Sequence, residues 1–194
     1  MIALPSTPGG FPCVLADPPW AFRDVGVRGS AEGHYHTMRT MEIAAMPVAS
    51  LAAPNALLFL WTTSAHLLDG SAACVCEGWG FEPKTTVAWV KARTSRLGGP
   101  GSALVLDKLQ IGCGYYTRAA HELLVIARRG KARVRDRGVP SVIFAPRSRH
   151  SAKPVEAYTM IERLTEGPRL ELFARGLPRP GWIGWGNEFG LEVA

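Results

Sequence analysis

The sequence predicts an α/β domain with a largely parallel sheet that is covered by helices. Short apolar runs of strand length alternate along the chain with segments whose apolar residues recur at helical spacing. Of the 194 residues, 47% are hydrophobic, which is enough for a substantial core. No internal repeat and no change in composition divides the chain, so we expect a single domain over residues 1–194.

Each predicted strand is a short apolar run that ends at turn or loop residues. These runs cover residues 11–16, 56–61, 81–91, 122–127, 141–145, 169–174 and 182–185. The first run ends abruptly at Asp17-Pro18-Pro19. In open α/β sheets ligands bind beyond the carboxyl ends of the strands, so we expect a ligand site at Asp17.

The predicted helices lie between these strands. One is expected to begin near Thr40 and to break at Pro47. A second is expected over residues 64–77, with Ser64 as its cap and an apolar stripe made of Leu67, Leu68, Ala72 and Val75. A third should start near Pro154, since proline is tolerated in the first helical turn. Residues 21–39 and 92–112 show no periodicity and are expected to be loops.

Composition and charge indicate the class of partner. The formal net charge is +6, which favours an anionic partner such as nucleic acid. The four cysteines match neither a zinc knuckle nor a CxxC motif, so we expect reduced thiols and no metal site. No apolar run is long enough to span a membrane, and we expect a cytoplasmic protein with no membrane partner. The alanine, glycine and arginine content favours a bacterial or phage source.

Asp17-Pro18-Pro19-Trp20 has the chemistry of a site for a weakly nucleophilic amine. Asp17 offers a carboxylate, and Pro18 offers the carbonyl of a stiff backbone without a competing N–H. Two such acceptors suit the exocyclic amine of adenine, because they hold its hydrogens and lie where positive charge develops. Trp20 is expected to stack on a base or to pack in the pocket wall. The alternative is that this segment is only a tight turn with a core tryptophan.

A series of segments gives the chain its family resemblance. They are ADPPW (16–20), HYHTM (34–38), LFLWTT (58–63), EGWGFE (77–82), AWVK (88–91), GYYTRAAHELLV (114–125), HSAKPVEAY (150–158), IERL (161–164), LELFAR (170–175) and WIGWGNE (182–188). In this order they resemble the MT-A family of N6-adenine methyltransferases, named after the seventy-kilodalton subunit of the eukaryotic mRNA adenosine methyltransferase. The resemblance covers nearly the whole chain and implies a Rossmann-like class I methyltransferase fold in permuted motif order.

The resemblance also implies S-adenosyl-L-methionine as cofactor and a role for each matching residue. Asp17, Pro18, Pro19 and Trp20 would form the catalytic motif, while Tyr35 and His36 would line the adenine pocket. Lys153 would pair with the cofactor carboxylate as a compact point charge. The cofactor residues implied are Asp17, Lys153, Glu171, Arg175, Asn187 and Glu188. Gly176-Leu177-Pro178 stand where members that act on RNA often carry a His-Asn pair, so those ribose contacts are missing or supplied elsewhere.

Further contacts follow from the residues themselves. Lys91 lies where a strand meets a predicted loop, so Trp89 beside it is expected to edge the substrate site. Glu122 opens a buried strand and needs a partner, for which Arg118 or a substrate group is expected. A set of basic side chains either contacts nucleic-acid phosphates or forms a solvated face: Arg93, Arg96, Arg129, Lys131, Arg133 and Arg135.

The predicted activity is methyl transfer to the N6 amine of adenine in nucleic acid. DNA is favoured over RNA because the compact chain shows no RNA-binding extension. The alternatives are an RNA adenosine N6-methyltransferase, a non-catalytic nucleic-acid-binding partner of an active paralogue, and a methyltransferase for a small-molecule or protein amine. The intact Asp17-Pro18-Pro19-Trp20 motif disfavours the non-catalytic partner. We expect a monomer or a homodimer.

Overall fold

The structure is a computed structural model that describes residues 4–21, 37–96, 104–112, 114, 116–147, 152–176, 179–186 and 188–189. Residues 94–96, 104–107 and 188–189 are described by their backbone alone. Tyr35, His36 and Asn187 of the expected site therefore lie outside the described residues.

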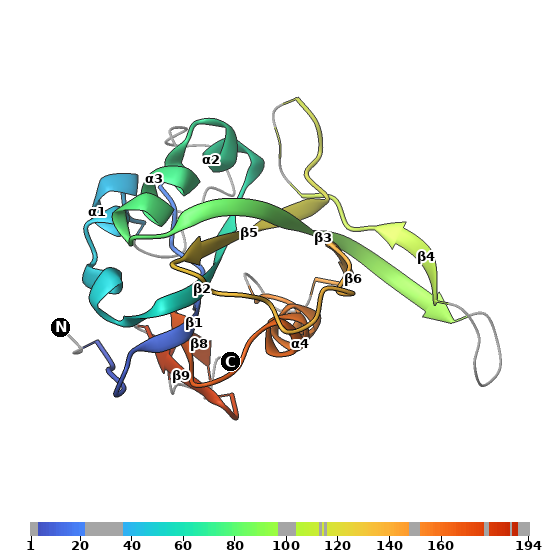
Figure 1. Cartoon of the computed structure of the whole chain (residues 1–194). Helices are drawn as coiled ribbons and strands as arrows, with labels where there is room; N and C mark the ends of the chain where they lie inside the picture. The colour runs from blue at the N-terminus through green and yellow to red at the C-terminus, as the bar shows by residue number, and fades with distance from the viewer. Residues whose placement is uncertain are drawn as a thin grey trace.

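The strands form one large sheet and a separate small pair (Figure 1). The sheet order is β4-β3-β5-β2-β1-β7-β9, with β6 beside β3, and β8 pairs with β10. Their bounds are β1 Phe11–Ala16, β2 Ala52–Thr62, β3 Glu82–Arg96, β4 Leu104–Leu109, β5 His121–Arg129, β6 Val142–Ala145, β7 Arg169–Leu172, β8 Arg175–Gly176, β9 Trp182–Trp185 and β10 Glu188–Phe189.

The α/β class is confirmed, and the sheet is more mixed than predicted. β1 pairs in parallel with β2 and β7, and β7 pairs in parallel with β9. β5 runs antiparallel to both of its neighbours, β2 and β3. A buried strand reads as an apolar run in either direction, so its direction is not visible in local sequence. Because β5 is reversed, its first residues lie at the carboxyl ends of β1 and β2.

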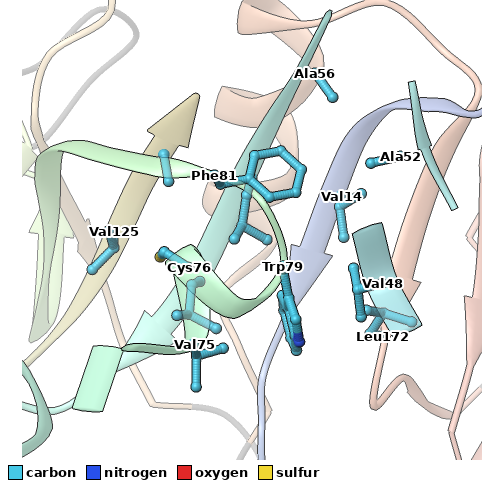
Figure 2. Packing of buried hydrophobic residues seen from close by; sticks show 14 of the residues in the cluster. Val14, Val48, Ala52, Ala56, Val75, Cys76, Trp79, Phe81, Val125 and Leu172 are labelled. Carbon is cyan, nitrogen blue, oxygen red and sulfur yellow. The ribbon is translucent and has the colours of Figure 1, made fainter. Parts of the chain in front are cut away.

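Helices cover both faces of the sheet (Figure 1). One face packs against α1 (Thr40–Ala44), the 3₁₀ turn η2 (Pro47–Ser50) and α3 (Ser71–Gly78), and the other packs against α4 (Val155–Leu164). Side chains alternate between the faces along β1, so Val14 joins the first core cluster and Leu15 the second. Figure 2 shows the first cluster, in which Trp79 lies among small aliphatic residues. Its indole Nε1 donates to the Ile43 carbonyl at 2.9 Å, so the buried N–H has a partner.

The predicted helix over 64–77 is wrong in one respect, because it is two helices. α2 (Ser64–Leu68) ends before Gly70, which has φ of 82° and the left-handed conformation that glycine adopts without strain. The Asp69 carboxylate then accepts the N–H of Ser71 at 2.9 Å as α3 begins. The change of direction buries Ala72 and Val75 but leaves Leu67 and Leu68 exposed. The cap of α2 is Thr63 rather than Ser64.

The expected loop over 92–112 is also wrong. β3 continues to Arg96 and pairs with β4, forming a two-stranded ribbon that projects from the body of the sheet (Figure 1). Polar and basic residues hide the end of β3 at 92–96 from a search for apolar runs, whereas Leu104, Val105 and Leu106 of β4 form a short apolar run that was missed.

No helix within the described ranges is both long and apolar enough to cross a membrane.

Candidate active site

Asp17 follows the carboxyl end of β1 directly, which is where the sequence predicts a ligand site. Backbone hydrogen bonds shape the loop that follows it. The Trp20 N–H donates to the Pro18 carbonyl at 2.9 Å, and the Met38 N–H donates to the Pro19 carbonyl at 2.8 Å. The Pro18 carbonyl oxygen still has a second lone pair with which to accept a hydrogen bond.

The Trp20 ring is buried and held from two sides. Its Nε1 donates to the Trp61 carbonyl at 3.0 Å, and its face stacks on His66 with ring centroids 5.0 Å apart. His66 Nε2 also lies 3.2 Å from the Ala21 carbonyl, so one imidazole touches both the ring and the backbone at the end of the motif. Trp20 belongs to the first core cluster, and its burial does not leave the ring free to stack on a base.

A row of alternating charges crosses the sheet beside the motif. Lys153 Nζ lies 2.8 Å from the Asp17 carboxylate and 3.1 Å from the Glu122 carboxylate. Lys91 Nζ lies 2.6 Å from the other oxygen of Glu122. Lys153 also lies over the ring of Trp61, 5.4 Å from its centroid. The row therefore joins residues from β1, β3, β5 and the start of α4 into one network.

The pKa values of this network follow from burial and pairing. Burial by itself lowers the pKa of Lys153, but Asp17 and Glu122 together outweigh it and hold that pKa above its usual value. Burial raises the pKa of Glu122, but Lys153 and Lys91 outweigh it and hold that pKa below its usual value. Lys153 is therefore a cation and Glu122 an anion at neutral pH.

Glu171 lies on the same face, one strand away from Asp17. Burial raises the pKa of its carboxyl group, the Tyr158 hydroxyl that donates to it at 2.6 Å lowers it, and the charge of Asp17 raises it again. The net effect is a raised pKa. Burial and the Glu171 carboxylate also raise the pKa of Tyr158, so its hydroxyl remains a hydrogen-bond donor. The Tyr158 ring packs edge-on against Trp182, and Arg179 lies over it.

The LELFAR and WGNE segments meet beyond the ends of β7 and β9. The Ala174 N–H donates to the Trp185 carbonyl at 2.9 Å, and the backbones of Arg175 and Glu188 pair in register. Gly186 sits against this turn, where a Cβ would lie 2.3 Å from the Ala174 carbonyl oxygen. Two expected cofactor residues, Arg175 and Glu188, are thus neighbours.

Phe173, at the centre of the same turn, has φ of 60°. A non-glycine residue in the left-handed region stores strain of about 1–3 kcal/mol, and such strain clusters at ligand sites. This turn follows the Glu171 strand directly and lies at the edge to which β1 delivers Asp17.

The other expected substrate residues have mixed outcomes. The partners of Glu122 are Lys91 and Lys153, so the expected pairing with Arg118, whose side chain is exposed, is wrong. Trp89 is buried and its Nε1 donates to the Ala145 carbonyl, while Lys91 Nζ lies 5.2 Å from its ring centroid. Trp89 therefore supports Lys91 from beneath.

The expected nucleic-acid residues fall into two separate groups. Arg93 and Arg96 lie on β3 where it leaves the sheet, at the edge of Asp17. Arg129 pairs with Ala56 at the start of β2, whereas Ala16 pairs with Leu60, so about 13 Å of strand separates that edge from the motif. The remaining three follow in the loop after Arg129, namely Lys131, Arg133 and Arg135.

This placement puts the loop at the edge of the sheet away from Asp17, and its expected contact with phosphates stays a prediction. The Arg129 guanidinium donates to the Ala49 carbonyl at 2.5 Å, and Arg135 lies 3.6 Å from Glu166. The Arg135 N–H also donates to the Leu164 carbonyl at the far end of α4. The loop therefore contacts the edge of the sheet that lies opposite to the motif.

Sequence reasoning missed three contributors to the site. They are His66 against Trp20, Tyr158 on Glu171 and the Trp61 ring beneath Lys153. A histidine just after the cap of a short helix is a weak signal, and tyrosine and tryptophan in apolar patterns read as core residues.

The comparison with known families decides the relationship. The MT-A70 model matches residues 11–188, which include every strand of the site. The chain belongs to the MT-A70 family. MT-A70 proteins are N6-adenine methyltransferases of the class I fold that use S-adenosylmethionine as methyl donor.

Individual MT-A70 relatives differ in how much of their length this chain covers. It is 28% identical over 205 residues to the type II methyltransferase M.MunI of a Mycoplasma species, covering 93% of this chain and 76% of the relative. It is 32% identical over 184 residues to the N(6)-adenosine-methyltransferase MT-A70-like protein of Drosophila melanogaster, covering 93% of this chain and 27% of the relative. It is 29% identical over 189 residues to the human N(6)-adenine-specific methyltransferase METTL4, covering 92% of this chain and 37% of the relative. The chain thus spans about a quarter to a third of these eukaryotic relatives.

The chemistry of the MT-A70 site fits the methionine end of the cofactor. That end carries one ammonium and one carboxylate, and Asp17 and Lys153 offer one partner of opposite charge for each. In the structure the two side chains neutralise each other. Among the described residues, no group of three or more histidine, cysteine, aspartate or glutamate side chains could hold a metal ion.

Proposed function

We propose that this chain is a site-specific DNA N6-adenine methyltransferase whose catalytic motif is Asp17-Pro18-Pro19-Trp20. The observation that carries the proposal is the position of Asp17, which lies at the carboxyl end of β1 and is hydrogen-bonded to Lys153. The family model matches residues 11–188, a range that contains this motif together with LELFAR and WGNE. A protein that only holds nucleic acid has no use for this charged row.

Asp17 and Pro18 would act on the amine. The Asp17 carboxylate and the Pro18 carbonyl would accept the two N6 hydrogens, which localises the lone pair on nitrogen and stabilises the charge that develops there. Lys153 holds the Asp17 side chain through a contact at 2.8 Å, and Glu122 holds Lys153 in turn at 3.1 Å. After transfer, N6 would lose one proton to a neighbouring acceptor or to water.

The cofactor would supply an electrophilic methyl group on sulfur. We assign its methionine end to Asp17 and Lys153, and its remaining contacts to the turn formed by LELFAR and WGNE. The residues assigned there are Glu171, Arg175, Asn187 and Glu188. Arg175 and Glu188 support this assignment because their backbones are paired.

We assign the substrate side to residues beside the charged row. Tyr35 and His36 would line the adenine pocket, and Lys91 with Glu122 would border it. Trp89 would act only through Lys91, because its own ring is buried.

DNA is proposed over RNA on the name of one relative. M.MunI, which matches 93% of this chain, is named a type II methyltransferase, a designation used for enzymes that modify DNA.

The proposal is tested by methyl transfer to matched polymers. Tritium-labelled S-adenosylmethionine is incubated with duplex DNA, single-stranded DNA and RNA of one sequence, and the products are digested to nucleosides. We expect label in N6-methyldeoxyadenosine from DNA, and a loss of roughly a thousandfold or more with Asp17→Ala.

Asp136→Ala is the matched control. It removes an aspartate that pairs with Arg163 and lies far from the motif. It should retain activity at temperatures where the protein is folded. Label in RNA alone would overturn the choice of DNA. Equal activity of Asp17→Ala and the wild type would overturn the proposed centre, and binding without any transfer would favour the non-catalytic alternative.

A further inference from the structure

The ribbon formed by β3 and β4 leaves the sheet at the catalytic edge. From Glu82 to Lys91 the strand β3 pairs with β5 and β6, but from Ala92 to Arg96 it pairs with β4. β3 runs in the same direction as β1 and β2, because each pairing with β5 reverses direction once. Its last residues therefore extend beyond the edge to which β1 delivers Asp17.

The ribbon carries two cations directly opposite each other. Arg93 pairs in register with Lys108, and both side chains are exposed. Like charges directly opposite each other in an antiparallel pair repel and destabilise the pairing. Neither side chain makes an ion pair with any residue whose side chain the structure describes. An external anion would remove this repulsion.

These cations continue the charged row of the active site. Lys91 lies two residues before Arg93 on the same strand, so both side chains point to the same face. Lys91 then contacts Glu122 at 2.6 Å, Glu122 contacts Lys153 at 3.1 Å, and Lys153 contacts Asp17 at 2.8 Å. A continuous row of charged side chains, alternating in sign from Lys91 onward, thus leads from the ribbon to the catalytic carboxylate.

We propose that the β3–β4 ribbon binds duplex DNA, with Arg93 and Lys108 on the phosphates of the strand that carries the target adenine. This inference rests on the proposed function. A base inside a duplex must be flipped out before its amine can react, so the phosphates beside it must be held near the site. A two-stranded ribbon also has the dimensions that the major groove of B-DNA admits.

The rival surface is the basic loop after β5. It carries more cations than the ribbon, namely Lys131, Arg133, Arg135 and Arg137, but it lies at the opposite edge of the sheet. A polymer bound there would be separated from Asp17 by the length of the parallel strands. The two surfaces can therefore be compared directly with variants of equal charge change.

The test measures the salt dependence of duplex DNA binding for three proteins. They are the wild type, Arg93→Gln with Lys108→Gln, and Arg133→Gln with Arg137→Gln. Each phosphate contact contributes about 0.9 to the slope of log Kobs against log salt concentration. We expect the ribbon variant to lower the magnitude of the slope by about two and the loop variant to leave it unchanged.

Calorimetric titration with S-adenosylmethionine is the control for folding, and it should give equal affinity for all three proteins. An unchanged slope for the ribbon variant, or an equal fall for both variants, would overturn the proposal. A loss confined to RNA would overturn the choice of duplex DNA. Wild-type protein that shows the ribbon-dependent slope but methylates no adenine would refute the proposed function while the ribbon assignment stands.

Discussion

The imidazole of His66 stacks on the indole of Trp20 at 5.0 Å and 25°, and its Nε2 lies 3.2 Å from the carbonyl of Ala21. A carbonyl oxygen only accepts, so Nε2 carries the proton and donates to Ala21. Nδ1 lies 2.9 Å from the Thr63 hydroxyl, which can donate to it. His66 therefore fixes the end of the catalytic motif while Lys153 fixes its start.

His66 variants separate these two contacts. His66→Phe keeps the stack, His66→Gln keeps a donor for the Ala21 carbonyl, and His66→Ala keeps neither. We expect kcat to fall by roughly a hundredfold for the alanine variant and less for the other two, because displacing a reacting group by about 1 Å costs on that order. The KM for S-adenosylmethionine should change little, and steady-state kinetics measures both.

Val75→Ala is the matched control for His66, since it truncates a buried side chain in the neighbouring helix α3. It should lower Tm, but at temperatures below the melting range its kcat should equal that of the wild type. If His66→Ala loses no more kcat than Val75→Ala at equal stability, His66 is only a core residue.

Lys153→Met tests the buried ion pairs. Removing Lys153 leaves the Asp17 carboxylate without its cation and leaves Glu122 with Lys91 alone, so we expect the free energy of unfolding to fall by about 3–5 kcal/mol at pH 7. The control is Lys84→Met, whose exposed pair with Glu82 should contribute less than about 1 kcal/mol. Urea denaturation measures both losses, and equal losses would contradict the role of burial.

The pH dependence of that loss has a definite sign. The pKa of Glu122 is lowered in the folded state, so its stabilisation is complete above its ordinary value of 4.5 and is lost as pH falls through the lowered value. The pKa of Lys153 is raised, so its contribution is complete below 10.5 and is lost only above the raised value. The difference between the wild type and Lys153→Met should therefore be constant near neutrality and shrink in acid.

Glu171→Gln should behave in the opposite way. The pKa of Glu171 is raised by burial, so its contribution to stability is present in full below 4.5 and is lost as pH rises through the raised value. The amide keeps an acceptor for the Tyr158 hydroxyl and removes a buried charge. We expect the Tm of Glu171→Gln minus that of the wild type to increase as pH rises from 4 to 8. The affinity of the variant for S-adenosylmethionine should be lower.

The comparison for Glu171→Gln is Glu77→Gln, an exposed carboxylate on α3. Its Tm should differ little from that of the wild type, because the side chain is exposed. Differential scanning fluorimetry across the pH range measures both variants, and parallel curves would mean that the Glu171 pKa is not raised.

Gly186→Ala tests the turn at which the two C-terminal motifs meet. The added Cβ would lie 2.3 Å from the Ala174 carbonyl oxygen and 2.9 Å from the Phe173 carbonyl carbon, so the backbone must move. We expect a loss of about 1–3 kcal/mol in stability and at least about a tenfold loss in cofactor affinity by calorimetry. Gly138→Ala, whose Cβ would meet only a side-chain oxygen of Asp136 at 3.2 Å, should change neither.

Local sequence predicted the strands and their ends well. The runs at 11–16, 122–127, 141–145 and 182–185 are strands within a few residues of those limits, and the third helix covers Val155–Leu164. It also placed Asp17 correctly at a strand end. Burial and periodicity are local properties, and each run of side chains carries them by itself.

Contacts between distant segments were beyond local sequence. The reversed direction of β5 brings Glu122 to Lys153 and sends Arg129 to the opposite edge. In the sequence the basic residues form a single group. The sheet separates Arg93 on the ribbon from Arg133 in the loop after β5. Strand direction depends on how connections cross the sheet, and no single run of residues records that.

The sequence by itself determined the α/β class, the family and the motif that begins at Asp17, because these depend on residue types in order along the chain. The tertiary structure alone decided which partners Asp17 has. Lys153 lies 136 positions away from it, and Glu122, the second partner of Lys153, lies 105 positions away. Only the folded sheet brings Lys153 within hydrogen-bonding distance of both carboxylates. Charges in a partly buried network act over a few ångströms, so their effect on catalysis follows spatial neighbours rather than sequence neighbours.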